Sequence, residues 1–419
     1  MAALLRSCVA NAAATAQLGS RSASTASVVR SPSVPSSSLS GLLRRRPSAR
    51  HGLAAAAATS GARFSSSDGS EARLLGGAPI KDAEAISHIA FAFMGSKALF
   101  TALDIGVFTH LSGSRTMTLA ELNAAVPHVP ERSLQTLMTC LTSLGLVNHS
   151  DAGFSNVEAS EAFLVRGAKH DFGDYLRFQI DKQMYPFMEH CSDVLQNKPS
   201  AAKAVDYEQW MSDPVEARLY TESQHAGSTG PARGLSKKIP EILGECRTLL
   251  DVGGGSGGFS ITLAKQWPEL SCTVVDFPNV CAVGRDFVER DGMGGRVDFL
   301  EGNALTTDFP GERDAVLMSY ISSSVGGDDL PSLYSKAFAA LKPGGSVFVH
   351  DFMVEDDRTG PPLAALWALQ HMVFTPGAVS ITPAHLTGLL EGAGFGDVQV
   401  WEMIPGLTKV AVATKPLPL

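Results

Sequence analysis

The spacing of apolar residues in the first part of the chain predicts helices followed by a hairpin. In "ISHIAFAFMGSKALFTALDIGVFTHL", which begins at Ile86, apolar residues recur every three or four positions and predict a largely buried helix. Farther on, Thr118 is placed to cap one helix and Pro130 to open another. The segment "LVNHSDAGFSNV" predicts two short strands around an Asp-Ala-Gly turn, followed by a short helix. Helices and a hairpin in this order outline a winged helix within residues 82–200.

The second half of the chain alternates between strands and helices. The segment "DFGDYLRFQIDKQMYPFMEHCSDVLQNKPSAAKAVD" is predicted to be helical, and a domain boundary is expected near its Lys-Pro-Ser sequence. Beyond it, helical stretches separate the strand-like runs "TLLDVG", "SCTVVDF", "VDFLEGN", "DAVLMSY" and "GGSVFVHDF". This alternation predicts an α/β fold over residues 205–419, with a parallel sheet covered by helices on both faces.

The first 70 residues have the composition of an organellar transit peptide. Residues 1–66 contain eight arginines, many Ser and Ala residues, and neither Asp nor Glu. The sequence "ARFSSS" resembles a mitochondrial processing site, so we expect a mitochondrial protein, with the chloroplast as the alternative because of the Ser-rich body. A disordered basic arm that binds nucleic acid is the other interpretation.

Composition restricts the classes of function. A content of 44% hydrophobic and 18% charged residues fits a soluble globular protein, and no apolar run approaches the roughly 18 residues of a membrane-spanning helix. Cleavage of the transit peptide would leave 26 basic and 42 acidic residues, so the formal charge would change from -8 to -16. A protein this acidic is a poor ligand for nucleic acid. The recognition helix of the winged helix would offer Arg132 and almost no other cation.

The cysteines give no sign of a metal site. Five of them follow the transit peptide, and they form no CxxC pair and have no metal-ligand spacing. We therefore expect buried, reduced thiols and no bound metal.

A glycine-rich segment carries the strongest chemical signal. In "LLDVGGGSGGFSITLAKQWPELSCTVVDFPNV" an apolar strand ends in Asp251, runs into glycines from Gly253, and gives way to a helix near Phe259. Glycines allow close approach of a ligand and positive φ angles. The next strand ends in Asp276, where acidic residues accept hydrogen bonds from ribose hydroxyls. An acid directly before the loop favours S-adenosylmethionine (SAM) over a dinucleotide.

The glycine segment and three others resemble the SAM-binding domain of the plant-type and acetylserotonin-type O-methyltransferases. The other three are "RVDFLEGNALTTDFPGERDAVLMSY", "LKPGGSVFVHDFMVEDD" and "LTGLLEGAGFGDVQV". The resemblance extends from about Ile86 to the C-terminus. It implies a class I Rossmann-like methyltransferase sheet, preceded by a mainly helical winged-helix domain that forms a homodimer and helps to close the active site.

The resemblance also assigns residues to the cofactor. Asp251 would pair with the SAM ammonium, Gly253 and Gly255 would line the methionine part, and Asp276 would hold the ribose. Asn303 replaces the family's adenine-binding acid, so its amide oxygen is expected to accept from the adenine amino group. The complete expected cofactor set is Ser228, Asp251, Gly253, Gly255, Asp276, Phe277, Asn303, Ala304, Ser319 and Tyr320.

The family's catalytic histidine is missing from this sequence. In the O-methyltransferases a His-Asp pair takes the proton from the substrate hydroxyl, and that pair falls on Ser323 and Ser324 of "DAVLMSYISSSVGGDDL". The acids that orient the histidine fall near Asp351 and Ser380. A phenol with a pKa of about 10 needs a base to become a nucleophile at neutral pH. Three interpretations follow: the base lies elsewhere, the protein is inactive, or the nucleophile needs no deprotonation.

A thioether is a nucleophile that needs no base, because its sulfur attacks through a lone pair. Within the family, the sequence resembles the S-methyltransferases that act on methylthiohydroxybutyrate in dimethylsulfoniopropionate synthesis. The alternatives are an O-methyltransferase of a small hydroxylated, phenolic or indole metabolite with a relocated base, and a non-enzymatic winged-helix regulator that binds SAM only as a ligand.

Methylthiohydroxybutyrate is a small anionic thioether, so its pocket should contain a cation or several hydrogen-bond donors. The segments that line the substrate pocket in the family are "DYLRFQIDKQMYPF" and "LWALQHMVFTPG". They supply the candidates Tyr175, Arg177, Gln183, Tyr185, Trp367, Gln370 and His371. Arg177 has a structural alternative as the partner of Asp174 or Asp181, and His371 as a helix histidine.

Overall fold

The computed structural model describes residues 79–198, 207–375 and 377–418. The expected transit peptide lies outside these residues, and so does most of the expected domain boundary after Lys198. The mitochondrial location therefore stays a prediction.

The first part of the described chain is a small helical domain with a two-stranded sheet. Thr118 forms a capping box with Glu121, and Pro130 is the N-cap of the helix from Glu131, so both predicted helix starts are confirmed. The predicted hairpin is also present, with Val147 paired to Asn156 and Ser150 to Gly153. The elements are α2 (Ala83–Asp104), α3 (Val107–His110), α4 (Leu119–Ala125), α5 (Glu131–Ser143), β1 (Val147–Ser150), β2 (Gly153–Asn156) and α6 (Glu158–Phe163).

Helix α2 exposes most of its apolar residues in the single chain. Its buried residues are Phe100, Ala102 and Leu103, whereas Ile86 is 59% and Phe91 58% exposed. The prediction of a largely buried helix is therefore wrong for an isolated subunit. By length and composition alone, α2 is also long and apolar enough to cross a membrane, although no such segment was expected from the sequence. The reason is that most of its polar residues are uncharged, so its mean hydropathy stays high. Large exposed apolar surfaces usually mark interfaces.

The segment after α6 is helical, as predicted, but its first part is a π-helix, η1 (Tyr175–Met184). Three of its polar residues are buried: Gln179, Asp181 and Gln183. Helices of this kind are rare and occur frequently at functional sites. The segment continues through α7 (Tyr185–Phe187), η2 (Met188–His190) and α8 (Cys191–Leu195).

The second part of the chain contains a seven-stranded sheet in the order β5-β4-β3-β6-β7-β9-β8. Strands β3 to β7 are parallel, as predicted. The expectation of an all-parallel sheet is wrong for the last two strands, which form an antiparallel hairpin because only a short turn joins them. The strands are β3 (Thr248–Val252), β4 (Ser271–Asp276), β5 (Val297–Glu301), β6 (Arg313–Ser319), β7 (Leu341–Phe352), β8 (Gly396–Ile404) and β9 (Thr408–Thr414).

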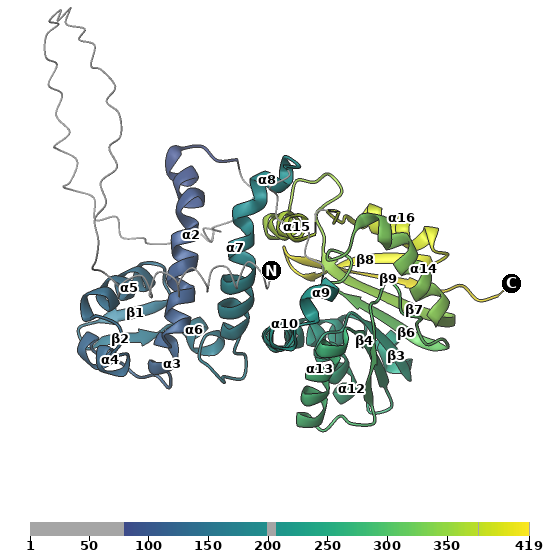
Figure 1. The fold of residues 1–419 in the computed structure, drawn as a ribbon, viewed down its shortest axis with the longest axis horizontal. Helices are drawn as coiled ribbons and strands as arrows, with labels where there is room; N and C mark the ends of the chain where they lie inside the picture. The colour runs from purple at the N-terminus through teal and green to yellow at the C-terminus, as the bar shows by residue number, and fades with distance from the viewer. Residues whose placement is uncertain (1–78, 199–206, 376, 419) are drawn as a thin grey trace, which may run out of the picture. The chain divides into compact units, whose positions relative to one another are not determined.

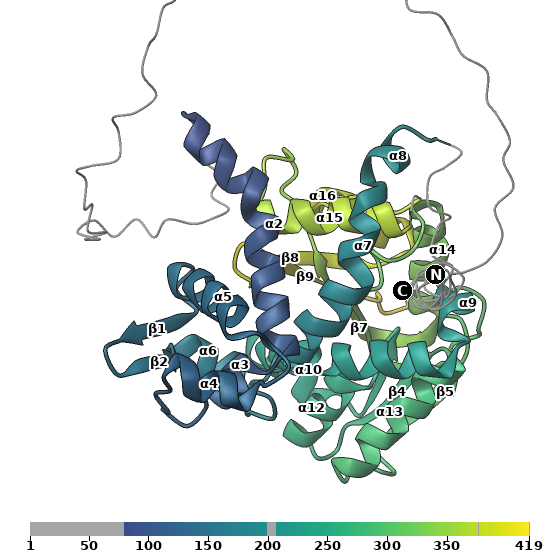
Figure 2. The same ribbon diagram turned by 60° about the vertical axis from the view of Figure 1, so that its left-hand side comes forward.

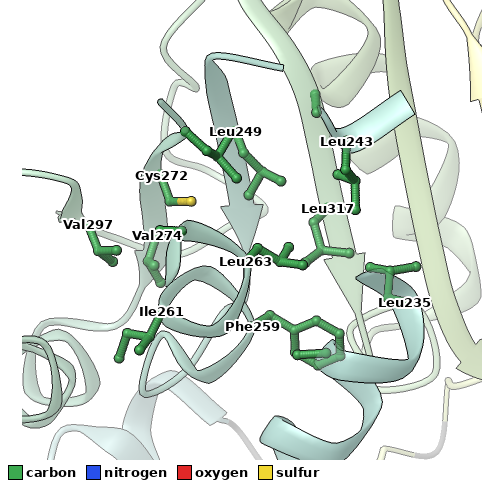
Figure 3. Close-up of a cluster of buried hydrophobic side chains, with 14 of the residues drawn as sticks. Leu235, Leu243, Leu249, Phe259, Ile261, Leu263, Cys272, Val274, Val297 and Leu317 are labelled. Carbon is green, nitrogen blue, oxygen red and sulfur yellow. The ribbon is translucent and has the colours of Figure 1, made fainter. Parts of the chain in front are cut away.

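Helices cover both faces of this sheet, as Figures 1 and 2 show. Leu249 and Leu317 point to one face, where they pack with Phe259 of α12 (Figure 3). Their neighbours Leu250 and Val316 belong to the cluster on the other face. The first face carries α10 (Pro214–Lys238), α11 (Pro240–Glu245), α12 (Gly258–Gln266) and α13 (Pro278–Arg290); the second carries α14 (Leu330–Ala340) and α16 (Pro383–Gly392).

Three further short elements lie near the carboxyl ends of the parallel strands. They are α9 (Tyr207–Met211), η3 (Gly327–Asp329) and α15 (Pro362–Phe374). The carboxyl ends of parallel strands meet at one edge of the sheet, where ligands bind in open α/β folds. The sheet thus brings residues from distant parts of the sequence to one edge.

The five cysteines in the described residues are free thiols, as expected. Cys246, Cys272 and Cys281 are buried, but Cys140 and Cys191 are only partly buried. The expectation of burial therefore holds for three of the five. The other two lie on helices that precede the large sheet.

We expect the exposed apolar residues of α2 to form the subunit interface. The double change Ile89→Asp and Phe93→Asp should convert a dimer into a monomer at micromolar concentration, because each carboxylate would be buried without a partner. Sedimentation velocity measures the change. Val215→Asp, at a position that is 73% exposed in α10, is the control and should leave the dimer intact. A dimer that survives the double change would contradict the assignment.

Candidate functional site

The glycine loop after β3 has a backbone that other residues adopt rarely. Gly253 and Gly255 have φ angles of 69° and 59°. A Cβ atom on Gly253 would lie 2.9 Å from Cδ1 of Ile321, whereas one on Gly255 would meet no atom within 4 Å. The loop therefore needs glycine at Gly253 for packing, and it leaves open space beside Gly255 where a ligand can approach the backbone.

Asp251 places a buried carboxylate directly below this loop. The residue is 1% exposed, and its Oδ2 accepts a hydrogen bond of 2.7 Å from the Ser260 hydroxyl. Its Oδ1 has no hydrogen-bond partner within the described part of the chain. Burial raises the pKa of Asp251 to about 6. A buried carboxylate with a free oxygen suits an ammonium group, which is the role expected of Asp251 toward SAM.

Asp276 lies at the end of β4 and faces the same loop. Its Oδ2 accepts from the Gly255 backbone N–H at 2.8 Å, and its Oδ1 accepts from the Phe277 N–H at 2.8 Å. Each oxygen keeps a second lone pair, so the carboxylate can still accept from two ribose hydroxyls. Burial raises the pKa of Asp276 to about 6. The two backbone bonds fix the carboxylate in place before a ligand binds.

Asn303 makes different hydrogen bonds from those expected. Its Oδ1 accepts from the Leu305 N–H at 2.9 Å, and its Nδ2 donates to Oε2 of Glu208 at 2.8 Å. The backbone N–H of Leu305 thus occupies one of the two lone pairs of the oxygen expected to serve the adenine amino group. Sequence reasoning missed Glu208, because nothing in a five-residue helix 95 positions away marks it as a neighbour.

The other expected cofactor residues surround the same edge of the sheet. Ser228 lies against Gly258, although its hydroxyl donates to the Gln224 carbonyl within α10. Phe277 caps α13, and the carbonyl of Ala304 accepts from the ammonium of Lys336 at 2.6 Å. The structure therefore places Ser228, Phe277 and Ala304 beside the loops that follow β3, β4 and β5.

Tyr320 directly follows β6 and has a strained conformation. Its φ angle is 60°, which is unusual for a bulky residue. Its ring packs against His350 and Phe352, and the neighbouring Ser319 hydroxyl lies 3.0 Å from Nδ1 of His350. Burial raises the pKa of the Tyr320 phenol, so the phenol stays protonated at neutral pH. The ring is held at the carboxyl edge, where it can face a sulfonium group.

Ser323 occupies the expected position of the catalytic base and is tied to an acid. Its hydroxyl donates to Oδ1 of Asp351 at 2.6 Å, and its backbone N–H donates to Oδ2 at 3.0 Å. Asp351 is fully buried, and burial raises its pKa to about 6. The acid expected to orient a histidine therefore has a serine as its partner, and Ser323 offers no group that titrates near neutral pH.

Five polar side chains of two helices each have at least one buried atom without a hydrogen-bond partner among the described residues. They come from η1 and α15: Nε of Arg177, Oε1 of Gln179, both amide atoms of Gln183, Oε1 of Gln370 and Nδ1 of His371. Buried polar atoms are nearly always hydrogen-bonded, so such a set is typical of a site for a polar ligand. Gln179 was not expected from the sequence, although it lies four residues from both Tyr175 and Gln183.

Aromatic contacts connect these residues to Tyr320. The ring of Phe352 lies 4.9 Å from Tyr320, 4.6 Å from Trp367 and 5.7 Å from His371. After burial, the second cause that raises the pKa of Tyr320 is the nearby phenol of Tyr175 on η1. Both η1 and α15 therefore approach the carboxyl end of β6, where the cofactor loops also meet.

Two of the expected substrate residues have structural partners. Nη2 of Arg177 pairs with Asp174 at 2.7 Å, which is the structural alternative given above, although Nε of Arg177 stays free. Tyr185 packs edge-on against Phe100 of α2, with Nζ of Lys97 lying 4.5 Å above its ring. Tyr185 thus faces α2 instead of the aromatic cluster around Phe352.

Comparisons with known proteins agree with this geometry. The profile of an O-methyltransferase domain matches residues 196–396, and that of an O-methyltransferase dimerisation domain matches residues 87–166. A 3-hydroxy-5-methyl-1-naphthoate 3-O-methyltransferase of Streptomyces sahachiroi is 28% identical over 79% of this chain and 94% of its own length. An N,N-dimethyltransferase of Streptomyces rimosus is 25% identical over 81% of this chain and 98% of its own.

Solved structures show the same fold. Human N-acetylserotonin methyltransferase in complex with SAM superimposes with a TM-score of 0.72 at 22% identity, covering 81% of this chain and 99% of that one. The class I methyltransferase fold with a helical dimerisation domain and SAM as the methyl donor are thus confirmed.

Asp276→Ala should weaken SAM binding without unfolding the protein. Loss of the acceptor leaves two ribose hydroxyls and two backbone N–H groups without a partner, at a cost of about 1–3 kcal/mol, or roughly 5- to 150-fold in Kd. Isothermal titration calorimetry measures the change. Asp286→Ala removes an exposed carboxylate of α13 and is the control. Unchanged SAM affinity in Asp276→Ala would rule out the ribose role.

SAM affinity should fall as the pH drops below about 6. The pKa of both Asp251 and Asp276 is raised to about 6, so both are ionised above that pH and become protonated below it. A neutral acid no longer attracts the SAM ammonium, and each proton that must be lost for binding adds up to about tenfold in Kd per pH unit. Calorimetry between pH 7 and 5 measures the slope. In Asp251→Asn the slope should decrease, and a flat profile in the unaltered protein would contradict the prediction.

Proposed function

Since this chain is a SAM-dependent methyltransferase with the catalytic and dimerisation domains of the O-methyltransferases, we propose that it methylates the thioether sulfur of a small 2-hydroxy acid, 4-methylthio-2-hydroxybutyrate. The proposal rests on one observation, which is that Ser323 and Asp351 form a closed hydrogen-bonded pair where a catalytic base is expected. A base-dependent reaction loses its proton acceptor at this position. A thioether reaction needs none.

The proposed reaction balances without a proton transfer. Bound SAM supplies an electrophilic methyl group on a sulfonium. The lone pair of the substrate sulfur forms the new bond to the methyl carbon, and the electron pair of the broken bond stays on the departing sulfur. One thioether and one sulfonium are consumed, and one of each is formed. The task of the protein is therefore alignment and exclusion of water.

The buried polar atoms of η1 and α15 suit the acid end of this substrate. A carboxylate and a hydroxyl offer acceptors to Nε of Arg177 and to the amide nitrogen of Gln183, while the substrate hydroxyl can donate to an amide oxygen. Leaving these protein atoms unpaired would cost about 1–3 kcal/mol each. An acidic substrate would satisfy them, whereas a flat aromatic phenol offers fewer hydrogen-bonding groups.

The sulfonium product would form beside aromatic rings. Tyr320, Phe352 and Trp367 form a continuous stack through contacts of 4.9 Å and 4.6 Å. Aromatic faces attract cations that lack N–H donors. Since one sulfonium is present throughout the reaction, these rings would stabilise the positive charge while it passes from one sulfur to the other.

O-methylation of a hydroxylated aromatic metabolite is the second candidate, and one observation favours it. Nδ1 of His371 is buried without a partner among the described residues, so it can accept a proton from a substrate. Burial lowers the pKa of His371 to about 4, which leaves the ring neutral at pH 7 but makes it a weak base. The naphthoate relative acts on an oxygen, and the Streptomyces rimosus relative on a nitrogen. Similar domains therefore serve more than one kind of acceptor atom.

If the nucleophile is a thioether, the chemical step should not depend on pH between 6.5 and 9. Single-turnover rates at saturating SAM should be flat, because no group has to lose a proton. Ser323→His should give no gain on the thioether, while a phenol should gain from a histidine beside Asp351. Ser323→Ala, the matched control, should retain the thioether rate within a few-fold.

Two results would favour the second candidate instead. One is a rate that rises tenfold per pH unit below neutrality on the thioether. The other is a phenol or hydroxyindole that is methylated faster than methylthiohydroxybutyrate at equal concentration. In that case His371→Ala should abolish turnover and leave SAM affinity unchanged.

A further inference from the structure

The topology of the sheet locates the adenine end of the cofactor site. Asp251 at the end of β3 suits the ammonium, and Asp276 at the end of the adjacent β4 suits the ribose. The next strand outward is β5, which pairs with β4 and leads into Gly302 and Asn303. A nucleoside that runs from β3 across β4 therefore places its base beside Asn303.

Asn303 is unable to supply the carboxylate that this position lacks. The amide orientation is fixed by its two partners, because Oδ1 faces a backbone N–H donor and Nδ2 faces a carboxylate acceptor. A carboxylate does lie beside Asn303: Oε2 of Glu208 is 2.8 Å from Nδ2 of Asn303. Its Oε1 accepts no hydrogen bond from the described residues, and its side chain is exposed. It can therefore accept a further hydrogen bond.

Helix α9 is held in place by the same loops that form the cofactor site. Nδ2 of Asn279, just after β4, donates to the carbonyls of Met211 and Ser212, at 2.9 Å each. The phenol of Tyr207 interacts with Ser324, beyond β6. With the contact between Glu208 and Asn303, α9 is thus attached to the segments that follow β4, β5 and β6. These attachments fix the position of Glu208 relative to the loops that would surround adenine.

We propose that Glu208 is a cofactor-binding residue whose carboxylate accepts from the 6-amino group of adenine, and that Asn303 holds it in place. In the family that this chain resembles, the adenine-binding acid lies at the position of Asn303, in the loop after β5. In this chain the corresponding negative charge lies on α9. A carboxylate discriminates strongly between adenine and hypoxanthine, because the amino donor of adenine becomes a carbonyl acceptor in hypoxanthine and then faces the carboxylate. This role concerns recognition of the cofactor and is independent of the atom that receives the methyl group.

The test compares two ligands that differ only at position 6 of the base, S-adenosylhomocysteine and S-inosylhomocysteine. The unaltered protein should prefer the adenosyl compound by at least about tenfold, since hydrogen bonds to charged groups are strong. Glu208→Ala should weaken binding of the adenosyl compound about tenfold and should not weaken that of the inosyl compound, because it removes an acceptor that faces the carbonyl of hypoxanthine. Glu301→Ala removes another exposed carboxylate near this loop, one that pairs with Arg285, and should change neither affinity.

Exchange of the two groups provides a second test. Asn303→Asp alone sets two carboxylates side by side and should weaken binding of S-adenosylhomocysteine. Adding Glu208→Gln returns one carboxylate and one amide to the pair and should restore affinity. The proposal is overturned if Glu208→Ala keeps the preference for adenosine, or if it weakens both ligands equally, which would make α9 only a structural support. Calorimetry of these ligands needs no methyl acceptor, so failure here is distinguishable from failure of the proposed S-methylation.

Discussion

Acidic side chains buried at the carboxyl ends of parallel strands are the constraint on which this structure depends. Asp251, Asp276 and Asp351 end β3, β4 and the buried part of β7, and burial raises the pKa of each to about 6. A buried carboxylate is costly unless it is paired or hydrogen-bonded. The three acids differ in how this cost is met. Asp276 and Asp351 accept backbone N–H groups, whereas one oxygen of Asp251 has no partner in the described part of the chain and is available to a cation.

Asp251 and Asp351 differ in their remaining capacity to accept hydrogen bonds. For Asp251 this capacity concerns cofactor binding, and for Asp351 it concerns the chemical step. The Asp251 oxygen that has no partner among the described residues can hold an ammonium group. The hydroxyl and the backbone N–H of Ser323 each donate to one carboxylate oxygen of Asp351. A serine in this position satisfies the buried acid without adding a titratable group. A site that binds a methyl donor but has no base beside it is consistent with a neutral nucleophile.

Several unusual features of the backbone and of the buried side chains occur around the same edge. Tyr320 has a positive φ angle, η1 is a π-helix, and the glutamines of η1 and α15 keep unpaired amide atoms. Proteins tolerate such features where function requires them, and the surrounding packing supplies the stability. Here the support is the two-faced core of the sheet. Leu249 packs into the cluster on one face, which Figure 3 shows, and Leu250 packs into the cluster on the other face. The exposed apolar part of α2 indicates that the first domain is completed by a second subunit.

The sequence by itself determined the parts of this protein that depend on local patterns. Alternating apolar runs predicted β3 to β7, the capping residues Thr118 and Pro130 marked helix starts, and the glycines with Asp251 and Asp276 located the cofactor loop. Only the tertiary structure decided which residues become neighbours across long separations. Examples are the contact of Glu208 with Asn303, the pairing of Ser323 with Asp351, and the antiparallel pairing of β8 with β9. Hydrogen bonds between distant residues leave no periodic signal in a sequence, because they depend on how the strands are ordered in the sheet. The same reason explains why α2 was expected to be buried, since its apolar pattern is the same whether the covering surface belongs to its own chain or to a partner.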